Sequence, residues 1–429
     1  MNKVMLFDRV CRVVAYCALA AGLGLLAVEL VRQAKPLDAS QLQPGFAGGV
    51  RGFDFMMRVN ECNCLCERVD PMDVWTGKVS HPLYYPFDDP SARTQEKCEP
   101  VNGYTPWAYV FVYPFTCVSR DIAWGLFYGL MALGIVGWLV TAFWLGRRVR
   151  NSLADGLFVL AAVVLAAPMF LIGVMAGNYA PIIGGAAALL LVGFERGRTW
   201  DVVVAMALTV MMMKPQMSVL FVIPLLISGR VRPVVISAII CLAALGVVAV
   251  MCGKSPVELT LAIPSLAAPV FSGCGLLPGY VYAGVDSVLG QGKALFVFPA
   301  VAGLAICCWL TWKCRGGDAL RLFAPAVLCS VCWSYARPHQ LCLSWIPLAS
   351  LAVSFIRSQT IVRKAFCVMA MICASRVYYI PLRGLNMLGA IDDRVLYGVI
   401  LPPLTQTTDL LALLCLAVVI AGEVRKTDA

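Results

Sequence analysis

Lys214, Pro215 and Gln216 interrupt an apolar part of the chain and are the residues best suited to chemistry. The runs on either side, 200–213 and 217–228, contain one charged residue between them. An ionisable side chain at membrane depth is costly, so it usually faces a polar cavity that belongs to a functional site. Pro215 also leaves the backbone carbonyl one turn earlier without its helical partner. The alternative is a short external turn in which Lys214 extends to the surface.

The overall composition is that of a membrane protein. Of the 429 residues, 60% are hydrophobic and 14% are charged, and the mean hydropathy is +0.82. This balance excludes a soluble globular protein. The first apolar run, 13–31, is long enough to span a bilayer and lacks an evident cleavage site, so we expect an uncleaved helix. The net charge of +10 is assigned to basic cytoplasmic loops, and no nucleic-acid partner is expected.

Basic residues between the apolar runs predict the orientation. Each successive pair of basic clusters leaves room for two crossings, so the positive-inside rule puts both termini in the cytoplasm. We therefore expect an all-α polytopic protein, one integral membrane domain over 1–429, with about twelve transmembrane helices. The basic clusters are Lys3/Arg9/Arg12, Arg147/Arg148/Arg150, Arg196/Arg198, Arg230/Arg232, Lys313/Arg315/Arg321, Arg357/Arg363/Lys364 and Arg425/Lys426. The expected spans are 13–31, 123–146, 155–176, 179–194, 200–213, 217–229, 233–252, 293–312, 319–335, 340–356, 365–382 and 401–421.

This topology puts the unusual polar features on the external side of the membrane. Two long segments lie there, a first external loop over 33–122 and a second over 253–292. The cytoplasmic loops are short and contain no phosphate-binding motif of the Walker or Rossmann type. We therefore expect a multi-pass protein of the cell (inner) membrane whose active site faces outward.

One set of cysteines in the first external loop differs from those inside the apolar runs. Cys62, Cys64 and Cys66 form a C-x-C-x-C run, and Cys98 follows later. This spacing is not that of a zinc site, and an external compartment is oxidising, so disulfides are favoured over a metal. One example is a bond from this run to Cys98, but the sequence leaves the pairing open.

Several short motifs, in this order along about residues 50–350, resemble glycosyltransferase family 87. That family contains polyprenyl-phosphate-mannose-dependent mannosyltransferases of the membrane-embedded C superfamily. Two departures from the family pattern are Asn178, where Gln is common, and His339, in a region that tends to be acidic. The motifs are Gly52-Phe53-Asp54-Phe55, Asp70-Pro71-Met72-Asp73-Val74, Tyr104-Thr105-Pro106-Trp107, Ala176-Gly177-Asn178-Tyr179, Met213-Lys214-Pro215-Gln216, Gly229-Arg230-Val231-Arg232 and Trp333-Ser334-Tyr335.

The resemblance implies a reaction. One sugar, mannose or a pentose, passes from a polyprenyl-phosphate donor to an external glycan or glycolipid acceptor, with inversion at the sugar carbon. An acid of the first external loop acts as the general base, which must reach the acceptor hydroxyl whose proton it removes. We expect this base to be Asp54, with Asp70 and Asp73 as competitors.

The same resemblance implies groups that bind the donor. Cations at the membrane boundary stabilise the negative charge of the departing phosphate, so no metal and no other cofactor is expected. We assign the donor phosphate to Lys214, Arg337 and His339, and further substrate contacts to Asn178, Gln216 and Tyr335.

Two other functions remain open from the sequence. A polysaccharide polymerase or ligase that acts on lipid-linked oligomers also works externally with basic groups. A twelve-span secondary transporter would usually show two similar halves, and no such repeat is evident.

Overall fold

The computed structural model describes residues 3–34, 53–75, 79, 105–166, 173–174, 177–261, 293–333, 342–378, 381–382, 385–386, 390–391, 395–396 and 400–427. All the regular elements in these ranges are helical, as the composition predicts. Arg337, His339, Tyr335 and Cys98 lie outside the described residues.

A helix overlaps each of the predicted spans. The helices are α1 (Lys3–Ala34), α5 (Arg120–Arg147), α6 (Leu153–Val164), α8 (Ala180–Glu195), α9 (Asp201–Met211), α10 (Pro215–Ser218), α11 (Val222–Ile227), α12 (Val231–Cys252), α15 (Lys293–Lys313), α16 (Ala319–Trp333), α17 (Trp345–Arg357), α18 (Ile361–Ser375) and α21 (Leu401–Thr427). In the described part, three segments are by themselves long and apolar enough to cross a membrane: Val4–Val28, Arg120–Arg147 and Val231–Cys252. The chain is therefore a helical membrane protein, and the number of about twelve crossings stays a prediction.

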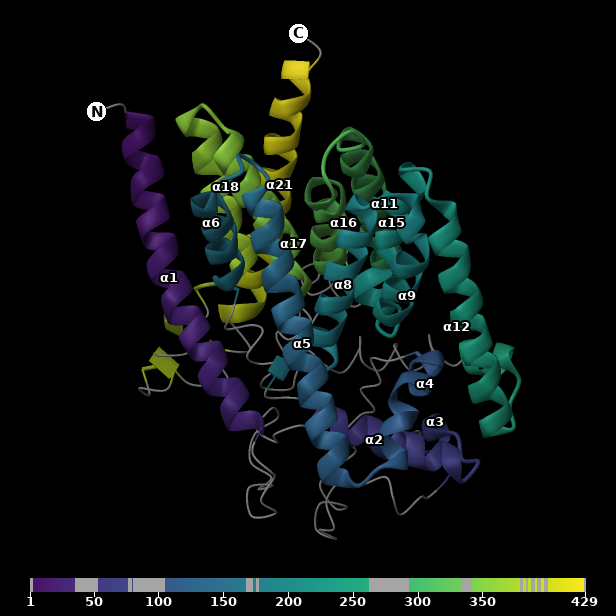
Figure 1. Ribbon diagram of the computed structural model, residues 1–429. Coiled ribbons are helices and arrows are strands. Elements are labelled where there is room, and N and C mark those ends of the chain that lie inside the picture. The colour runs from purple at the N-terminus through teal and green to yellow at the C-terminus, as the bar shows by residue number, and fades with distance from the viewer. Residues whose placement is uncertain are drawn as a thin grey trace.

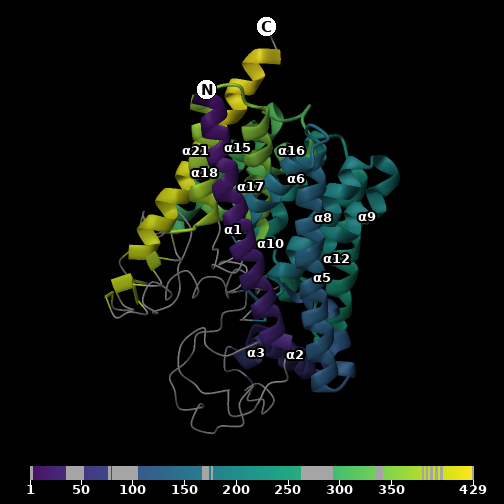
Figure 2. The same cartoon turned by 60° about the vertical axis from the view of Figure 1, so that its left-hand side comes forward.

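The first external loop contributes short helices at one end of the bundle. These are α2 (Phe53–Cys66), α3 (Pro71–Trp75) and α4 (Tyr109–Val112). The start of α1 and the end of α21 lie at the opposite end (Figure 1, Figure 2). This arrangement agrees with the predicted separation of the first external loop from both termini, although it does not orient the protein in a membrane.

Small residues allow α5 and α8 to approach closely. A Cβ atom built on Gly134 of α5 would lie 2.6 Å from the carbonyl oxygen of Pro181, and one on Gly185 of α8 would lie 2.5 Å from the Cα of Gly134. Neither position can accept a methyl group unless a backbone moves. Small residues at such positions allow membrane helices to pack closely. The contact fixes the start of α8 against the middle of α5.

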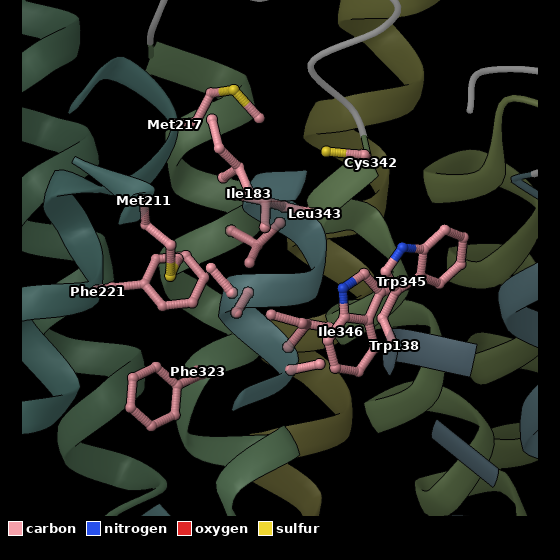
Figure 3. Packing of buried hydrophobic residues seen from close by; sticks show 14 of the residues in the cluster. Trp138, Ile183, Met211, Met217, Phe221, Phe323, Cys342, Leu343, Trp345 and Ile346 are labelled. Atoms are coloured by element: carbon pink, nitrogen blue, oxygen red, sulfur yellow. The ribbon is translucent and has the colours of Figure 1, made fainter. Parts of the chain in front are cut away.

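Large apolar side chains fill the space between these helices. Trp138 of α5, Ile183 of α8, Met211 of α9 and Phe323 of α16 belong to one buried cluster, with Phe221 beside Met211 and Phe323 (Figure 3). Interiors packed in this way resist small displacements. The start of α8 and the end of α9 are therefore held rigidly. Asn178 lies just before the start of α8, and Lys214 lies just after the end of α9.

Candidate active site

Asp54, Asn178 and Lys214 meet through direct hydrogen bonds, although they are far apart in the sequence. The Nζ of Lys214 donates to Oδ1 of Asn178 at 2.7 Å, and Nδ2 of Asn178 donates to Oδ2 of Asp54. Lys214 is 1% exposed and Asn178 is also 1% exposed, whereas Asp54 is half-buried. A cation and a carboxylate are thus joined by one amide, with the carboxylate nearest to solvent.

A break between two helices positions Lys214. Helix α9 ends at Met211 and α10 begins at Pro215, so Lys214 is the N-terminal cap of α10, with φ −127° and ψ 79°. These angles lie outside the α region, which a residue before proline avoids. The Met211 carbonyl oxygen, which Pro215 cannot bind, accepts instead from the backbone N–H of Lys214 at 3.1 Å and from the hydroxyl of Ser218 at 2.8 Å. The predicted helix break and the predicted buried cation are both present.

The end of the first external loop binds the same break. The backbone N–H of Thr105 donates to the Met213 carbonyl at 3.4 Å, and the indole Nε1 of Trp107 donates to the Met212 carbonyl at 2.9 Å. Two of the motifs that suggested the family are therefore in contact. Carbonyls exposed by a broken helix need such donors, because an unsatisfied polar group is costly in a membrane.

The orientation of the Asn178 side-chain amide follows from the groups that donate hydrogen bonds to it. Oδ1 accepts from the backbone N–H of Ala180 at 2.9 Å as well as from Lys214. Both partners are donors, so Oδ1 must face them and Nδ2 must face Asp54. Gly177, with φ +64°, supplies the left-handed turn before Asn178 that brings the amide back over the start of α8.

Aromatic packing fixes the residues that neighbour Asp54 and Asn178. Phe55 stacks on Phe127 of α5 with ring centroids 4.2 Å apart and an interplanar angle of 18°. Tyr179 meets the same Phe127 ring at 4.8 Å and 61°. Phe127 is fully buried, so one ring on α5 supports the neighbours of both Asp54 and Asn178. Phe127 lies within an apolar run, and no feature of its sequence context marks this role.

Asp70 and Asp73, the competing acids, form a separate ion-pair cluster with Lys254. The Lys254 ammonium contacts both carboxylates and lies 2.6 Å from Asp73. Burial alone would lower the pKa of Lys254, but its hydrogen bonds to the two acids outweigh that effect and raise the pKa above 10.5. Asp70 and Asp73 thus share one cation in a structural ion pair, and this arrangement favours Asp54 as the candidate base.

The structure describes one of the four remaining candidate residues. Gln216 lies in α10, two residues beyond Lys214, and is half-buried. Arg337, His339 and Tyr335 fall outside the described residues, so their assignment stays a prediction. Within the described ranges, no group of three or more His, Cys, Asp or Glu side chains is placed to hold a metal ion.

The cysteine run differs from the expectation. Cys62, Cys64 and Cys66 are free thiols rather than half-cystines. Cys62 and Cys64 are buried, and the Cys62 thiol lies 3.6 Å from the Tyr109 carbonyl oxygen. The Cys62 side chain therefore faces the packing between α2 and α4, where it behaves as a small apolar residue.

Comparison with known proteins identifies the family. Residues 102–336, more than half of the chain, match glycosyltransferase family 87. The matched range includes Asn178 and Lys214 and begins after Asp54. No curated protein and no solved structure matches the chain. The match favours a transferase over the transporter that the sequence left open. Because the matched range covers more than half of the chain, the protein belongs to glycosyltransferase family 87 and is a membrane glycosyltransferase.

Proposed function

We propose that this protein transfers one sugar, mannose or a pentose, from a polyprenyl-phosphate donor to a glycan or glycolipid acceptor on the external face of the membrane. Asp54 is the general base, and Lys214 binds the phosphate of the donor. The observation that carries this proposal is the hydrogen-bonded line Asp54–Asn178–Lys214. It pairs a proton acceptor with a cation, and family 87 membership supplies the reaction class.

Asp54 acts on the acceptor. Its carboxylate removes the proton of the acceptor hydroxyl while the hydroxyl oxygen forms a bond to the anomeric carbon of the donor sugar. The bond between that carbon and the phosphate oxygen breaks on the opposite face, so the configuration inverts. Asn178 donates to Oδ2 of Asp54, and a carboxylate has further capacity to accept a proton. The hydrogen bond thus orients the base without preventing its reaction.

Lys214 acts on the leaving group. The polyprenyl phosphate departs with the bonding electron pair, and its negative charge increases as the bond breaks. A fully buried ammonium stabilises such charge more strongly than one in water, because little solvent screens it. The hydrogen bond from Lys214 to Asn178 holds the cation close to the base, so both groups reach one sugar.

The experiment measures sugar transfer by purified protein supplied with polyprenyl-phosphate-mannose or a polyprenyl-phosphate pentose and a glycolipid acceptor. Asp54→Asn and Lys214→Gln are compared with the matched variants Asp73→Asn and Lys254→Gln. The matched residues are an aspartate and a lysine that bind each other away from the proposed site. We expect both site variants to lose transfer by about 100-fold or more, the range for general-base and electrostatic groups, and both matched variants to retain it.

Two results would refute parts of this proposal. If Asp54→Asn kept wild-type turnover at saturating donor, Asp54 would not be the base. If wild-type protein extended a lipid-linked oligomer in blocks and ignored monosaccharide donors, the polymerase or ligase alternative would replace the proposed reaction.

A further inference from the structure

Three arginines stack on tryptophans near the ends of three helices. The guanidinium of Arg148 lies 3.9 Å from the ring centroid of Trp144 at the end of α5. Arg196 lies 4.7 Å from the ring of Trp200, just beyond α8. Arg315 lies 4.0 Å from the ring of Trp312 at the end of α15. All three arginines are exposed, so these pairs are surface features.

Glu195 shows that the three pairs share one end of the molecule. Its carboxylate lies 3.6 Å from Arg148 and accepts a hydrogen bond from the backbone N–H of Ala319 at 2.8 Å. Arg196 is the next residue after Glu195, and Arg315 lies four residues before Ala319. The helix ends that carry the pairs therefore converge around one carboxylate, at the end of the bundle opposite to α2 and α3 (Figure 1).

Each pair follows an exposed apolar side chain on or next to its own helix. Val140 precedes Trp144 by one turn and is 58% exposed, and Trp309 precedes Trp312 and is 51% exposed. Leu189, 56% exposed, lies two turns before Arg196. In a membrane protein, such apolar faces contact lipid chains, so the pairs lie where the apolar surface ends. Tryptophan prefers this level, with its ring at the boundary between acyl chains and headgroups.

We propose that these three tryptophan–arginine pairs form a binding surface for the anionic headgroups of phospholipids. Stacking uses the flat face of the guanidinium, whereas a phosphate binds along its N–H edge, so one arginine can do both. The indole holds the cation at headgroup depth, where a membrane with anionic lipids is most negative. The partner is thus a lipid phosphate rather than a soluble anion.

The charges around the surface favour this partner. Asp318 is paired with Arg357 at 2.9 Å, and Asp201 lies 3.6 Å from Arg230, so both acids already face a cation. Glu195 is the acid that reaches one of the stacked arginines, Arg148. Arg196 and Arg315 are therefore the stronger sites for a phosphate, with Arg148 partly neutralised.

The test measures tryptophan fluorescence in nanodiscs that contain brominated phosphatidylglycerol or brominated phosphatidylcholine. Bromine quenches a nearby tryptophan, so a preference for the anionic lipid appears as stronger quenching by phosphatidylglycerol. The double variant Arg196→Gln/Arg315→Gln removes two stacked cations. Its matched control, Arg9→Gln/Arg232→Gln, removes two exposed arginines that have no tryptophan within four residues in the sequence.

We expect wild-type protein to prefer phosphatidylglycerol. The stacked double variant should lose that preference by roughly 30-fold in relative affinity, which corresponds to about 1 kcal/mol for each cation at an anionic surface. The control variant should keep most of it. Equal quenching of wild-type protein by the two lipids would overturn the proposal. Equal losses in both double variants would also overturn it, because the preference would then follow net charge rather than the stacked pairs.

Discussion

Phe127→Leu tests whether one aromatic ring positions the catalytic groups. The Phe127 ring lies 4.2 Å from that of Phe55, the neighbour of Asp54, and 4.8 Å from that of Tyr179, the neighbour of Asn178, measured between ring centroids. Leucine keeps the site apolar and nearly filled but cannot stack on Phe55. The variant therefore removes the support of the base while leaving the proposed reacting groups in place.

The expected magnitudes follow from these contacts. Phe127 contacts four rings, those of Phe55, Phe115, Tyr128 and Tyr179. Aromatic pairs contribute about 0.5–1.5 kcal/mol each beyond their buried area, so Phe127→Leu should destabilise the protein by about 2–6 kcal/mol. A displacement of a catalytic group by about 1 Å can lower the rate by on the order of 100-fold. We expect kcat to fall by roughly tenfold or more, because α2 and the start of α8 each lose one contact, with a smaller change in KM.

Phe323→Leu provides the matched control. Phe323 is also fully buried and contacts two rings, Phe194 at 5.3 Å and Phe221 at 5.6 Å. With two ring contacts rather than four, Phe323→Leu should lower thermal stability by less than Phe127→Leu and should leave kcat of the folded enzyme unaltered. The assay combines thermal unfolding with initial rates over a range of donor concentrations. If Phe127→Leu and Phe323→Leu lowered kcat equally, or if neither did, the ring would be ordinary core packing and the reasoning would fail.

Three further predictions concern single contacts. Asn178→Leu removes the amide that accepts from the buried Lys214 ammonium. It should therefore lower both thermal stability and kcat more than Asn178→Gln, which retains an amide. Equal effects of the two variants in both assays would argue against the role of the Asn178 amide in linking Asp54 and Lys214. Trp107→Phe removes the donor to the Met212 carbonyl and should destabilise the protein by about 0.5–1.5 kcal/mol, measured by thermal unfolding, whereas Phe111→Leu serves as a nearby comparison. Lys254→Gln should lower stability at neutral pH. Since the folded pKa of Lys254 is raised above 10.5, its contribution is full below pH 10.5 and disappears as the pH rises through the folded pKa, so unfolding curves of wild type and variant should converge there.

The sequence predicted the helical class, and it singled out three residues that the structure brings together. A lysine followed by proline within an apolar run is conspicuous, because both residues are costly in a membrane helix. The resemblance then selected Asp54 and Asn178, and the hydrogen bonds join all three residues.

Other parts of the site leave no trace in the sequence. Ser218 and Phe127 are ordinary residues of apolar runs, and their roles depend on which helix each one faces. The partner of Asp70 and Asp73 depends on where the far end of α12 lies, since Lys254 follows that helix. For Cys62 and Cys64 the sequence pattern was misleading. Their spacing and external placement suggested disulfides, but in the packed structure both are buried free thiols. Tertiary contacts of this kind cannot be read from periodicity or composition.

The hydrogen-bonded line from Asp54 to Lys214 also constrains when the site can form during synthesis. Its links join residues 124 and 36 positions apart, from segments that leave the ribosome at different times. Asp54 emerges first, and Asn178 and Lys214 follow only after α5 and α6 have been made. Thr105 and Trp107 likewise wait for the broken helix that they bind. A nascent chain that stops before residue 214 therefore contains Asp54 without Lys214, so the proposed site stays incomplete until α9 and α10 have been made.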